Sequence, residues 1–335
     1  MSVTAVSTPN IALIKYWGNR NNDLRLPMAD SLSITLNQPT VQIIVDRAER
    51  FTARTFEPDG TERTLTEKER ARLEKHFTLT KTYLDVLGLA KAFPGSVSLE
   101  IRSKIPRAIG IASSAAIFSC LAEAYAGLVG ENRSFTMQEK SVIGRLGSGS
   151  AARSLAGGFV ALHAGTGNDI DSAAAEQIAD ENHWNLFDVI IIPSAEEKKV
   201  GSTEGHTLAH TSPLFSKRID TIPRRQQECI DAILKKDFEK LQHVTEEDAL
   251  DMHNVMQTQT PPLKYLSNET YRMMEEVEEL RDTEHLEVLY TMDAGPTVHL
   301  ICTEAALPKI RAYAKEQKGC TLFEAGVGNG SHLLD

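Results

Sequence analysis

The sequence is poor in cysteine and short of positive charge. Its four cysteines, Cys120, Cys229, Cys302 and Cys320, include no CxxC pair, which favours reduced thiols over a disulfide framework and gives no reason to expect a structural metal. The chain has 36 Lys and Arg against 46 Asp and Glu, for a net charge of −10. This balance excludes a general affinity for nucleic acid or an anionic membrane. An anionic ligand must therefore be met by a few locally placed cations.

Long hydrophobic runs are also absent. No apolar stretch approaches the roughly 20 residues of a membrane span, and the first ten residues, MSVTAVSTPN, lack the pattern of a secretory signal. We therefore expect a soluble, cytoplasmic protein. The 335 residues predict two lobes of roughly 150 residues each. The chain contains no low-complexity linker, so the lobes should pack together.

The residue patterns alternate between strands and helices. Strands are predicted over 31–36, 41–46, 96–103 and from 187, and in two runs within 286–303 that meet at 293–296. Helices are predicted over 66–88, from the serine pair at 113–114 to Gly130, and over 213–235, 238–253, 268–282 and 306–317, with a short capped helix and a strand within 147–165. The pattern indicates an α+β protein, with one lobe over 1–185 and the other over 186–335.

The stretch PRAIGIASSAA, residues 106–116, is the strongest local signal. Gly110 permits a turn that a side chain would block, and Ser113 and Ser114 lie where the following helix starts. Free N–H groups and the positive end of the helix dipole attract an anion at such a position. The chain has no Walker A motif, so this would be a phosphate site of another kind. A serine-capped buried helix is the plainer interpretation of the segment alone.

A second cluster, GSGSAARS over 147–154, combines small polar residues with an arginine. Ser148 and Ser150 can donate to an anion, and Arg153 falls on the same side of the first helical turn as Ser150. An arginine holds a carboxylate or phosphate with two parallel hydrogen bonds. An exposed arginine on a short helix is the commoner alternative.

Two charged residues lie within apolar segments. Asp293 follows a strand in YTMDAGPT, and Lys15 lies in NIALIKYWGNR. A buried carboxylate requires a partner, so a lysine that pairs with an aspartate beside a transferring phosphoryl group is one interpretation. A turn aspartate and a lysine at a strand edge are the alternatives. His206 and His210 lack a third ligand for zinc and are expected to be solvated.

Together these segments resemble the GHMP superfamily of small-molecule kinases, and within it the mevalonate diphosphate decarboxylase family. The resemblance spans nearly the whole chain and rests on PNIALIKYWG, LP...DSLSITL, PRAIGIASSAA, GSGSAARSLAGGFV, GSTEGH and TMDAGP. It implies an N-terminal lobe like ribosomal protein S5 domain 2, a ferredoxin-like C-terminal lobe and an active site between them. It also implies a homodimer.

The resemblance further implies that ATP and Mg²⁺ are used to phosphorylate the 3-hydroxyl of a 5-phosphorylated mevalonate, after which phosphate and CO₂ leave. Asp293 would deprotonate or orient that hydroxyl with Lys15 beside it, and Arg153 would hold the departing carboxylate. The implied substrate-site residues are Asn10, Tyr16, Asn19, Ser148, Gly149, Ser150 and Ser202. Those implied for the ATP phosphates are Gly110, Ala112, Ser113 and Ser114, with Ser114 also at the magnesium.

Asn19 departs from the family pattern, which generally has a lysine there to neutralise the diphosphate. Losing one such contact costs about 1.5 to 3 kcal/mol, and Asp30 resembles relatives that use the monophosphate. We therefore expect a preference for mevalonate 5-phosphate, giving isopentenyl phosphate. In the alternative, mevalonate 5-diphosphate is decarboxylated and another cation, such as Arg20 or Arg107, replaces the missing one. A mevalonate 3-kinase and a non-catalytic sensor of the same fold are further alternatives.

Overall fold

The computed structural model describes residues 2–105, 113–130, 133–193 and 202–334. Its first sheet has six strands in the order β16 (His332–Leu334), β1 (Ser2–Ser7), β6 (Val41–Arg47), β9 (Val97–Ser103), β7 (Thr52–Phe56) and β8 (Glu62–Arg63). Residues of β6 are alternately buried and half-buried, which gives the sheet one core face. That face packs on α1 (Glu67–Val86), α2 (Ser113–Val129) and α3 (Met137–Gly147).

The second sheet has four strands in the order β11 (Ala174–Ala179), β10 (Phe159–His163), β5 (Ser31–Thr35) and β2 (Asn10–Ile14). Every residue of β2 and β5 is buried, so both faces of this sheet are covered. The short helix η1 (Gly149–Ser154) packs against α2 and α3 on one side and contacts β10, β5 and β2 on the other. Polar side chains at the end of β2 and on η1 are therefore held inside the molecule.

The third sheet is antiparallel, in the order β13 (Val288–Thr291), β14 (Val298–Thr303), β12 (Leu186–Ile192) and β15 (Thr321–Gly326). The helices of this half are α4 (Ser202–Leu208), η2 (Ala209–Thr211), α5 (Phe215–Lys235), α6 (Phe238–Thr258), α7 (Asn268–Glu284) and α8 (Leu307–Glu316). A small ribbon pairs β3 (Asn19–Asn21) with β4 (Leu26–Pro27). Helices α5 and α6 share a core with β2 and β5, which joins the two halves.

Local sequence explains where several helices begin. Thr66 with Glu69 and Thr136 with Glu139 form reciprocal capping boxes at α1 and α3, which satisfy backbone N–H groups that lack helical partners. Asp237 accepts a hydrogen bond from the backbone of Lys240 at the start of α6. These caps fix the ends of elements whose faces are then buried by packing.

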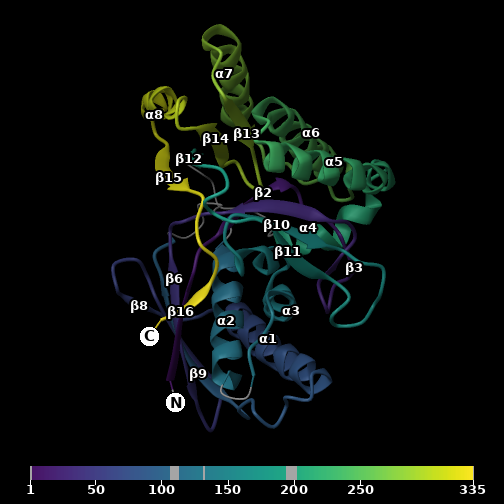
Figure 1. Cartoon of the computed structure of the whole chain (residues 1–335), viewed down its shortest axis with the longest axis vertical. Helices are drawn as coiled ribbons and strands as arrows, with labels where there is room; N and C mark the ends of the chain where they lie inside the picture. The colour runs from purple at the N-terminus through teal and green to yellow at the C-terminus, as the bar shows by residue number, and fades with distance from the viewer. Residues whose placement is uncertain (1, 106–112, 131–132, 194–201, 335) are drawn as a thin grey trace.

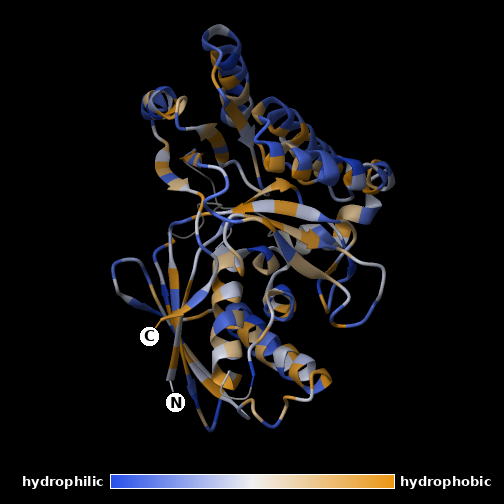
Figure 2. Cartoon of the chain, in the orientation of Figure 1, coloured by the Kyte–Doolittle hydropathy of each residue, from blue (hydrophilic) through white to orange (hydrophobic). Residues whose placement is uncertain are grey.

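In the lower half of Figure 1 the six-stranded sheet lies beside α1, α2 and α3. In the upper half, α5 to α8 lie with the third sheet. In Figure 2 the outer helices α7 and α8 carry mostly hydrophilic residues, whereas the middle of the molecule carries more hydrophobic ones. The chain ends near its start, because β16 pairs with β1. Within the described residues, no helix is both long enough and apolar enough to cross a lipid bilayer.

The predicted elements agree with the structure over most of the chain. Predicted helices over 66–88, 213–235 and 268–282 are confirmed as α1, α5 and α7, and the strand over 41–46 is confirmed as β6. The sequence analysis did not predict the strands β1, β2, β3, β4, β7, β8, β11, β15 and β16 or the helices α3 and α4. The cysteines are free thiols, as expected.

Candidate active site

Lys15 and Asp293 form an ion pair between the two halves of the molecule. Lys15 follows β2 directly and Asp293 lies in the loop between β13 and β14, yet Lys15 Nζ is 2.8 Å from Asp293 Oδ1. The lysine is 2% exposed, whereas the aspartate side chain is 30% exposed. The aspartate is thus the member of the pair that a ligand can reach.

The pair shifts the pKa of both groups. Burial lowers the pKa of the Lys15 ammonium, although Asp293 and Asp248 act to raise it. Burial acts to raise the pKa of Asp293, but the charges of Lys15, His299 and Arg153 outweigh it and leave that pKa below its usual value. Asp293 is therefore a carboxylate at neutral pH, ready to accept a proton.

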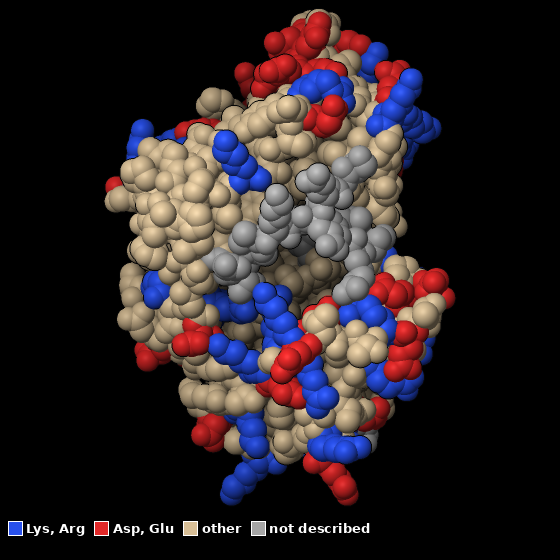
Figure 3. All heavy atoms as spheres, turned by 180° about the vertical axis from the view of Figure 1, so that it is seen from behind, with Lys and Arg blue, Asp and Glu red and all other residues tan. Residues whose placement is uncertain are grey.

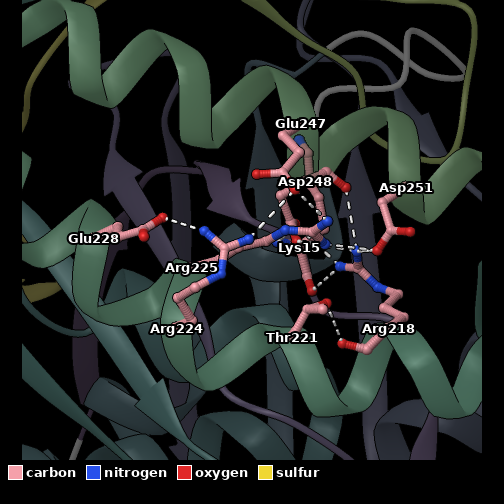
Figure 4. A network of polar contacts seen from close by, with 9 residues as sticks. All are labelled: Lys15, Arg218, Thr221, Arg224, Arg225, Glu228, Glu247, Asp248 and Asp251. Atoms are coloured by element: carbon pink, nitrogen blue, oxygen red, sulfur yellow. Dashed lines mark hydrogen bonds and ion pairs between the residues drawn. The ribbon is translucent and has the colours of Figure 1, made fainter.

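A network of buried charges holds the backbone of Lys15 (Figure 4). The Lys15 N–H donates to Asp248 Oδ2 at 2.6 Å, and the Lys15 carbonyl accepts from Arg218 Nη2 at 3.1 Å. Arg218 also donates to both Asp248 carboxylate oxygens at 3.0 Å and to Asp251 at 2.8 Å. Arg225 completes the network through Asp251 at 2.6 Å. Both polar groups of one peptide segment are thus fixed by helices α5 and α6.

Arg153 is a buried cation with only neutral hydrogen-bond partners among the described residues. It is 2% exposed, and it donates to Ser31 Oγ at 2.6 Å and to Asn10 Oδ1 at 3.4 Å. Its Nε has no hydrogen-bond partner, and no carboxylate lies within ion-pair distance of it in the described part of the chain. Burial lowers the pKa of Arg153 to about 10. A buried charge without a counterion is costly, so this position suits an anionic ligand.

Asn10 fixes the geometry around Arg153. Its amide donates to the backbone carbonyl of Ser150 at 2.9 Å and to Ser154 Oγ at 2.7 Å. The amide oxygen is thereby turned toward the Arg153 guanidinium. Asn10 links the end of β2 to η1 and holds the arginine in place.

Serine hydroxyls run from the start of α2 to η1. Ser114 Oγ lies 3.1 Å from Ser148 Oγ, which lies 3.1 Å from Ser150 Oγ. Gly149 lies against Tyr16, where an added Cβ would come 2.3 Å from the tyrosine ring. The structure thus brings together Ser114, Ser148, Gly149 and Ser150, which the sequence predicted from two separate motifs.

Asn19 and Tyr16 are hydrogen-bonded to each other, with the Tyr16 hydroxyl donating to Asn19 Oδ1. Asn19 Nδ2 in turn donates to Asn22 Oδ1 at 3.0 Å. Burial raises the pKa of Tyr16 to about 12, although the nearby charges of Arg25, Arg145 and Arg153 act to lower it. Arg25, which precedes β4, is therefore a cation close to Tyr16 that the sequence analysis did not single out.

The charged residues near Asn19, Arg20 and Asp30, both have partners within the protein. Arg20 donates to the backbone carbonyls of Gly167, at 3.0 Å, and Pro27, so its hydrogen bonds hold the chain rather than point to a ligand. Asp30 accepts from the backbone N–H of Ala164 at 2.7 Å and lies 3.6 Å from His163. Asp30 is therefore paired with a backbone N–H and a histidine within the protein.

His206 is not a solvated histidine, contrary to expectation. Its ring lies 4.4 Å from that of Tyr16 and 4.5 Å from that of Trp17, and its Nδ1 accepts from the Gly18 N–H at 3.0 Å. Burial lowers the pKa of His206 to about 3, and the charge of Arg25 acts in the same direction. A neutral His206 therefore packs on the Tyr-Trp-Gly segment, whereas His210 is exposed.

Some predicted residues lie outside the described part of the chain. These are Gly110 and Ala112 of the predicted phosphate loop, together with Arg107. Ser113 begins α2 and is exposed. Ser202 begins α4, but its side chain is not among those described.

Sequence reasoning did not place five residues at the site: Arg25, Arg218, Asp248 and His253 were not named, and His206 was expected to be solvated. His253 is 2% exposed, lies beside the backbone of Met292 and Asp293, and has no side-chain partner on either ring nitrogen among the described residues. Four of these residues are on α4, α5 and α6, where they resemble ordinary polar positions of amphipathic helices. Two of the five had a local signal, since Arg25 lies shortly after the Tyr-Trp-Gly motif and His206 ends the GSTEGH motif.

Figure 3 shows a hollow in the face of the molecule seen from behind, with Lys and Arg side chains gathered along its lower edge. The described site combines an ionised carboxylate, a buried ammonium, a guanidinium that forms no ion pair with the described residues, and a row of hydroxyls at a helix N-terminus. This combination suits proton abstraction from a hydroxyl on a ligand that also carries a carboxylate and phosphate groups.

Comparison with solved structures defines the class of protein. The chain matches a mevalonate diphosphate decarboxylase from Staphylococcus aureus with a TM-score of 0.88 and 28% identity, over 100% of this chain and 98% of that one. It matches MDDEF in complex with MVAPP, AMPPCP and magnesium with a TM-score of 0.87 and 29% identity, over 100% and 99% of the two chains. The chain therefore has the α+β GHMP kinase fold, with an N-terminal and a C-terminal domain.

Sequence comparison then gives the family. Residues 7–174 match the diphosphomevalonate decarboxylase-like N-terminal domain, and residues 188–321 match the mevalonate 5-diphosphate decarboxylase C-terminal domain. The diphosphomevalonate decarboxylase of Danio rerio is 35% identical over 327 residues, which are 92% of this chain and 77% of that protein. The chain belongs to the diphosphomevalonate decarboxylase family.

These matches favour the diphosphate alternative over the expected monophosphate preference. Both family models and the relative from Danio rerio carry the diphosphate in their names. The resemblance to the monophosphate branch, which rested on Asn19 and Asp30, is not supported. The enzyme class, an ATP-dependent carboxy-lyase, is that of the family.

Proposed function

We propose that this protein decarboxylates mevalonate 5-diphosphate in an ATP-dependent reaction that gives isopentenyl diphosphate, CO₂, ADP and phosphate. The observation that carries the proposal is the Lys15–Asp293 pair at 2.8 Å, together with the nearby buried Arg153, which has only neutral hydrogen-bond partners among the described residues. A proton acceptor and a carboxylate clamp are what such a reaction needs side by side.

Asp293 is the proposed base or orienting group for the C3 hydroxyl. Its carboxylate is ionised and partly exposed, so it can accept the proton as the hydroxyl oxygen attacks the terminal phosphorus of ATP. Lys15 keeps the carboxylate oriented and ionised. It is also close enough to counter the negative charge that develops during phosphoryl transfer.

Arg153 is the proposed clamp for the substrate carboxylate. Its guanidinium is held by Ser31 and Asn10, and Asp293 is near enough to influence its charge. When phosphate leaves C3, the bond between C2 and the carboxylate carbon breaks, its electron pair forms the new C2–C3 double bond, and CO₂ departs. A clamp that holds the carboxylate until then aligns the bond that breaks.

ATP and Mg²⁺ are the proposed cofactors, and the described residues fit them. The hydroxyls of Ser114, Ser148 and Ser150 form a row beside the N-terminus of α2, and such a position favours phosphate oxygens. Magnesium prefers oxygen ligands and is usually bound with substrate phosphates, so Ser114 would hold it with the nucleotide. The ion would neutralise phosphate charge. Relatives support this assignment, since MDDEF forms a complex with MVAPP, AMPPCP and magnesium.

Arg25 is the proposed replacement for the lysine that the family generally carries at position 19. It acts on both Tyr16 and His206 electrostatically, and the ribbon that pairs Asn19 with Pro27 brings its segment beside Asn19. No ion pair or hydrogen bond engages the Arg25 side chain among the described residues. A cation in this position next to Tyr16 is available for the 5-diphosphate.

The deciding assay measures ATP consumption and CO₂ release with mevalonate, mevalonate 5-phosphate and mevalonate 5-diphosphate offered separately. The proposal expects one CO₂ per ATP and a preference for the diphosphate. Preference for the monophosphate would revive the interpretation based on Asn19. ATP use without CO₂ would identify a 3-kinase, and no turnover with any substrate would favour a sensor.

Arg25→Gln tests the source of diphosphate selectivity. It should weaken diphosphate binding by about tenfold to a hundredfold, as expected for one lost charge-assisted contact, and affect the monophosphate less. Asn19→Lys in the Arg25→Gln background should restore the preference. If Arg25→Gln leaves the ratio of kcat/KM values for the two esters unchanged, Arg25 is not the selector.

Three further expectations complete the proposal. A homodimer, implied by the family, is checked by light scattering in solution. A cytoplasmic location is supported by the free cysteines and is checked by fractionation. The proposed division of the chain near residues 185 and 186 is checked by limited proteolysis.

A further inference from the structure

The strongest unassigned feature is the buried charge network of α5 and α6. Asp248 is fully buried, and Arg218 is 1% exposed. Within the described part of the chain, neither residue hydrogen-bonds to the row of serines or to Arg153, so the proposed chemistry does not use them. Burying two charges costs free energy unless they are fully hydrogen-bonded, and this network directs two of its hydrogen bonds to the backbone of Lys15.

We propose that Asp248 and Arg218 are positioning residues that set the orientation and protonation of the catalytic ammonium of Lys15. This proposal rests on the role proposed above for Lys15. The pair grips both polar groups of that residue's backbone, with Asp248 Oδ2 accepting from the N–H at 2.6 Å and Arg218 Nη2 donating to the carbonyl at 3.1 Å. The backbone of Lys15 is therefore held in place relative to α5 and α6.

These hydrogen bonds matter because Lys15 and Asp293 come from distant parts of the chain. Lys15 follows the end of β2, whereas Asp293 follows β13, 278 residues later. Helix α6 packs on both β2 and β13. By tying the end of β2 to α6, Asp248 fixes the distance over which Lys15 reaches Asp293. A small misplacement of a catalytic group can cost a large factor in rate.

The planar geometry of each group suits its task. Asp248 uses Oδ2 for the Lys15 N–H and both oxygens for Arg218, which is the bidentate pairing that arginine favours. Arg218 Nη1 then reaches Asp251 at 2.8 Å. A lysine at 218 would keep the positive charge but could not bridge the aspartate and the Lys15 carbonyl together.

Four charged or titratable groups surround the Lys15 ammonium. Asp293 and Asp248 favour its charged form, whereas Arg153 disfavours it. The charge of Lys15 in turn acts to lower the pKa of His253 on α6. Loss of the Asp248 charge should therefore lower the pKa of Lys15. The alkaline limb of the rate profile should then move to lower pH, provided that Lys15 must be protonated for turnover.

The test uses Asp248→Asn, Arg218→Lys and Lys15→Met in the full-length enzyme. Asp248→Asn should lower kcat at least tenfold with KM changed less than threefold, and should move the alkaline limb toward lower pH. Arg218→Lys should lower kcat without that shift in pH, because the Asp248 charge is kept. Glu123→Gln is the control, since it removes a buried carboxylate that pairs with Lys140 at 2.8 Å and has no hydrogen bond to Lys15 or Asp293 among the described residues.

The outcomes separate this proposal from the proposed function. Turnover that survives in Lys15→Met refutes the role of Lys15 itself. An inactive Lys15→Met with normal kcat and an unmoved alkaline limb in Asp248→Asn refutes only the positioning role. A loss of kcat in Asp248→Asn that matches the unfolded fraction measured by circular dichroism, with the same pH profile, also refutes it. Restored activity in Asp248→Glu would add support.

Discussion

Replacing Asp293 by asparagine tests the centre of the proposed site. The change keeps the shape of the side chain and removes its charge. An amide in place of the carboxylate cannot accept the hydroxyl proton, so turnover should fall by about 100- to 10,000-fold, the usual contribution of a general base. That loss corresponds to about 3 to 5.5 kcal/mol of transition-state stabilisation.

The same change should also destabilise the fold, because it leaves the Lys15 ammonium buried without its counterion. Breaking a fully buried ion pair costs about 3 to 5 kcal/mol. Asp293 is 30% exposed, and the amide oxygen of asparagine can still accept from Lys15, so we expect a loss of about 1 to 3 kcal/mol. The double variant Lys15→Met, Asp293→Asn should recover part of this stability, because neither charge of the pair then remains buried.

Coupled measurement of ATP consumption and CO₂ release gives the rates, and urea unfolding gives the stability. Asp23→Asn is the matched control, since Asp23 also pairs with a lysine, Lys75, at 2.8 Å, but is 86% exposed. It should change neither quantity measurably. Turnover in Asp293→Asn above about a tenth of the wild-type rate would falsify the role of Asp293 as the base.

Three other predictions concern the surroundings of this pair. Arg153→Gln should lower CO₂ release about tenfold to a thousandfold, because the carboxylate loses its charged clamp; an unchanged rate would contradict the clamp. Gly149→Ala should raise KM and lower the free energy of unfolding in urea by about 1 to 3 kcal/mol, since the new Cβ would lie 2.3 Å from the Tyr16 ring. Unchanged KM and stability would mean that the ring moves aside freely. Asp30 and Glu176 raise the pKa of His163 to about 9, so the stability that this histidine adds is present below about pH 6.5 and is lost as the pH rises through about 9. Because His163 is 45% exposed, wild type should exceed His163→Gln by no more than about 1 kcal/mol at low pH and by nothing well above the folded pKa; equal advantages at both pH values would contradict the pairing.

Much of the architecture followed from local patterns. The helix over 66–88 was predictable because Thr66 and Glu69 form a capping box and apolar residues recur at helical spacing. The strand at Val41–Arg47 was predictable because one of its faces is buried. Strand β2 is buried on both faces, so its sequence lacks the alternation that reveals a strand, and it was missed.

The residues of the candidate site were likewise only partly predictable from the sequence. The sequence singled out Lys15, Arg153 and Asp293 as candidates, because a charged residue within an apolar or glycine-rich segment is unusual, whereas their proposed roles came from the resemblance to the family. It could not identify Asp248 or Arg218, since a charged residue on an amphipathic helix normally faces solvent. Only the packing of α5 and α6 onto β2 buries these charges and turns them toward Lys15.

The partners of the charged residues around position 19 were likewise decided by the tertiary structure. The sequence showed that position 19 lacks a lysine and offered Arg20 as a substitute. The fold directs Arg20 to backbone carbonyls, pairs Asp30 with His163 and brings Arg25 close to Tyr16. Residue types are fixed along the chain, but the free energy of a charge depends on which groups surround it in space, and that is set only when distant segments pack together.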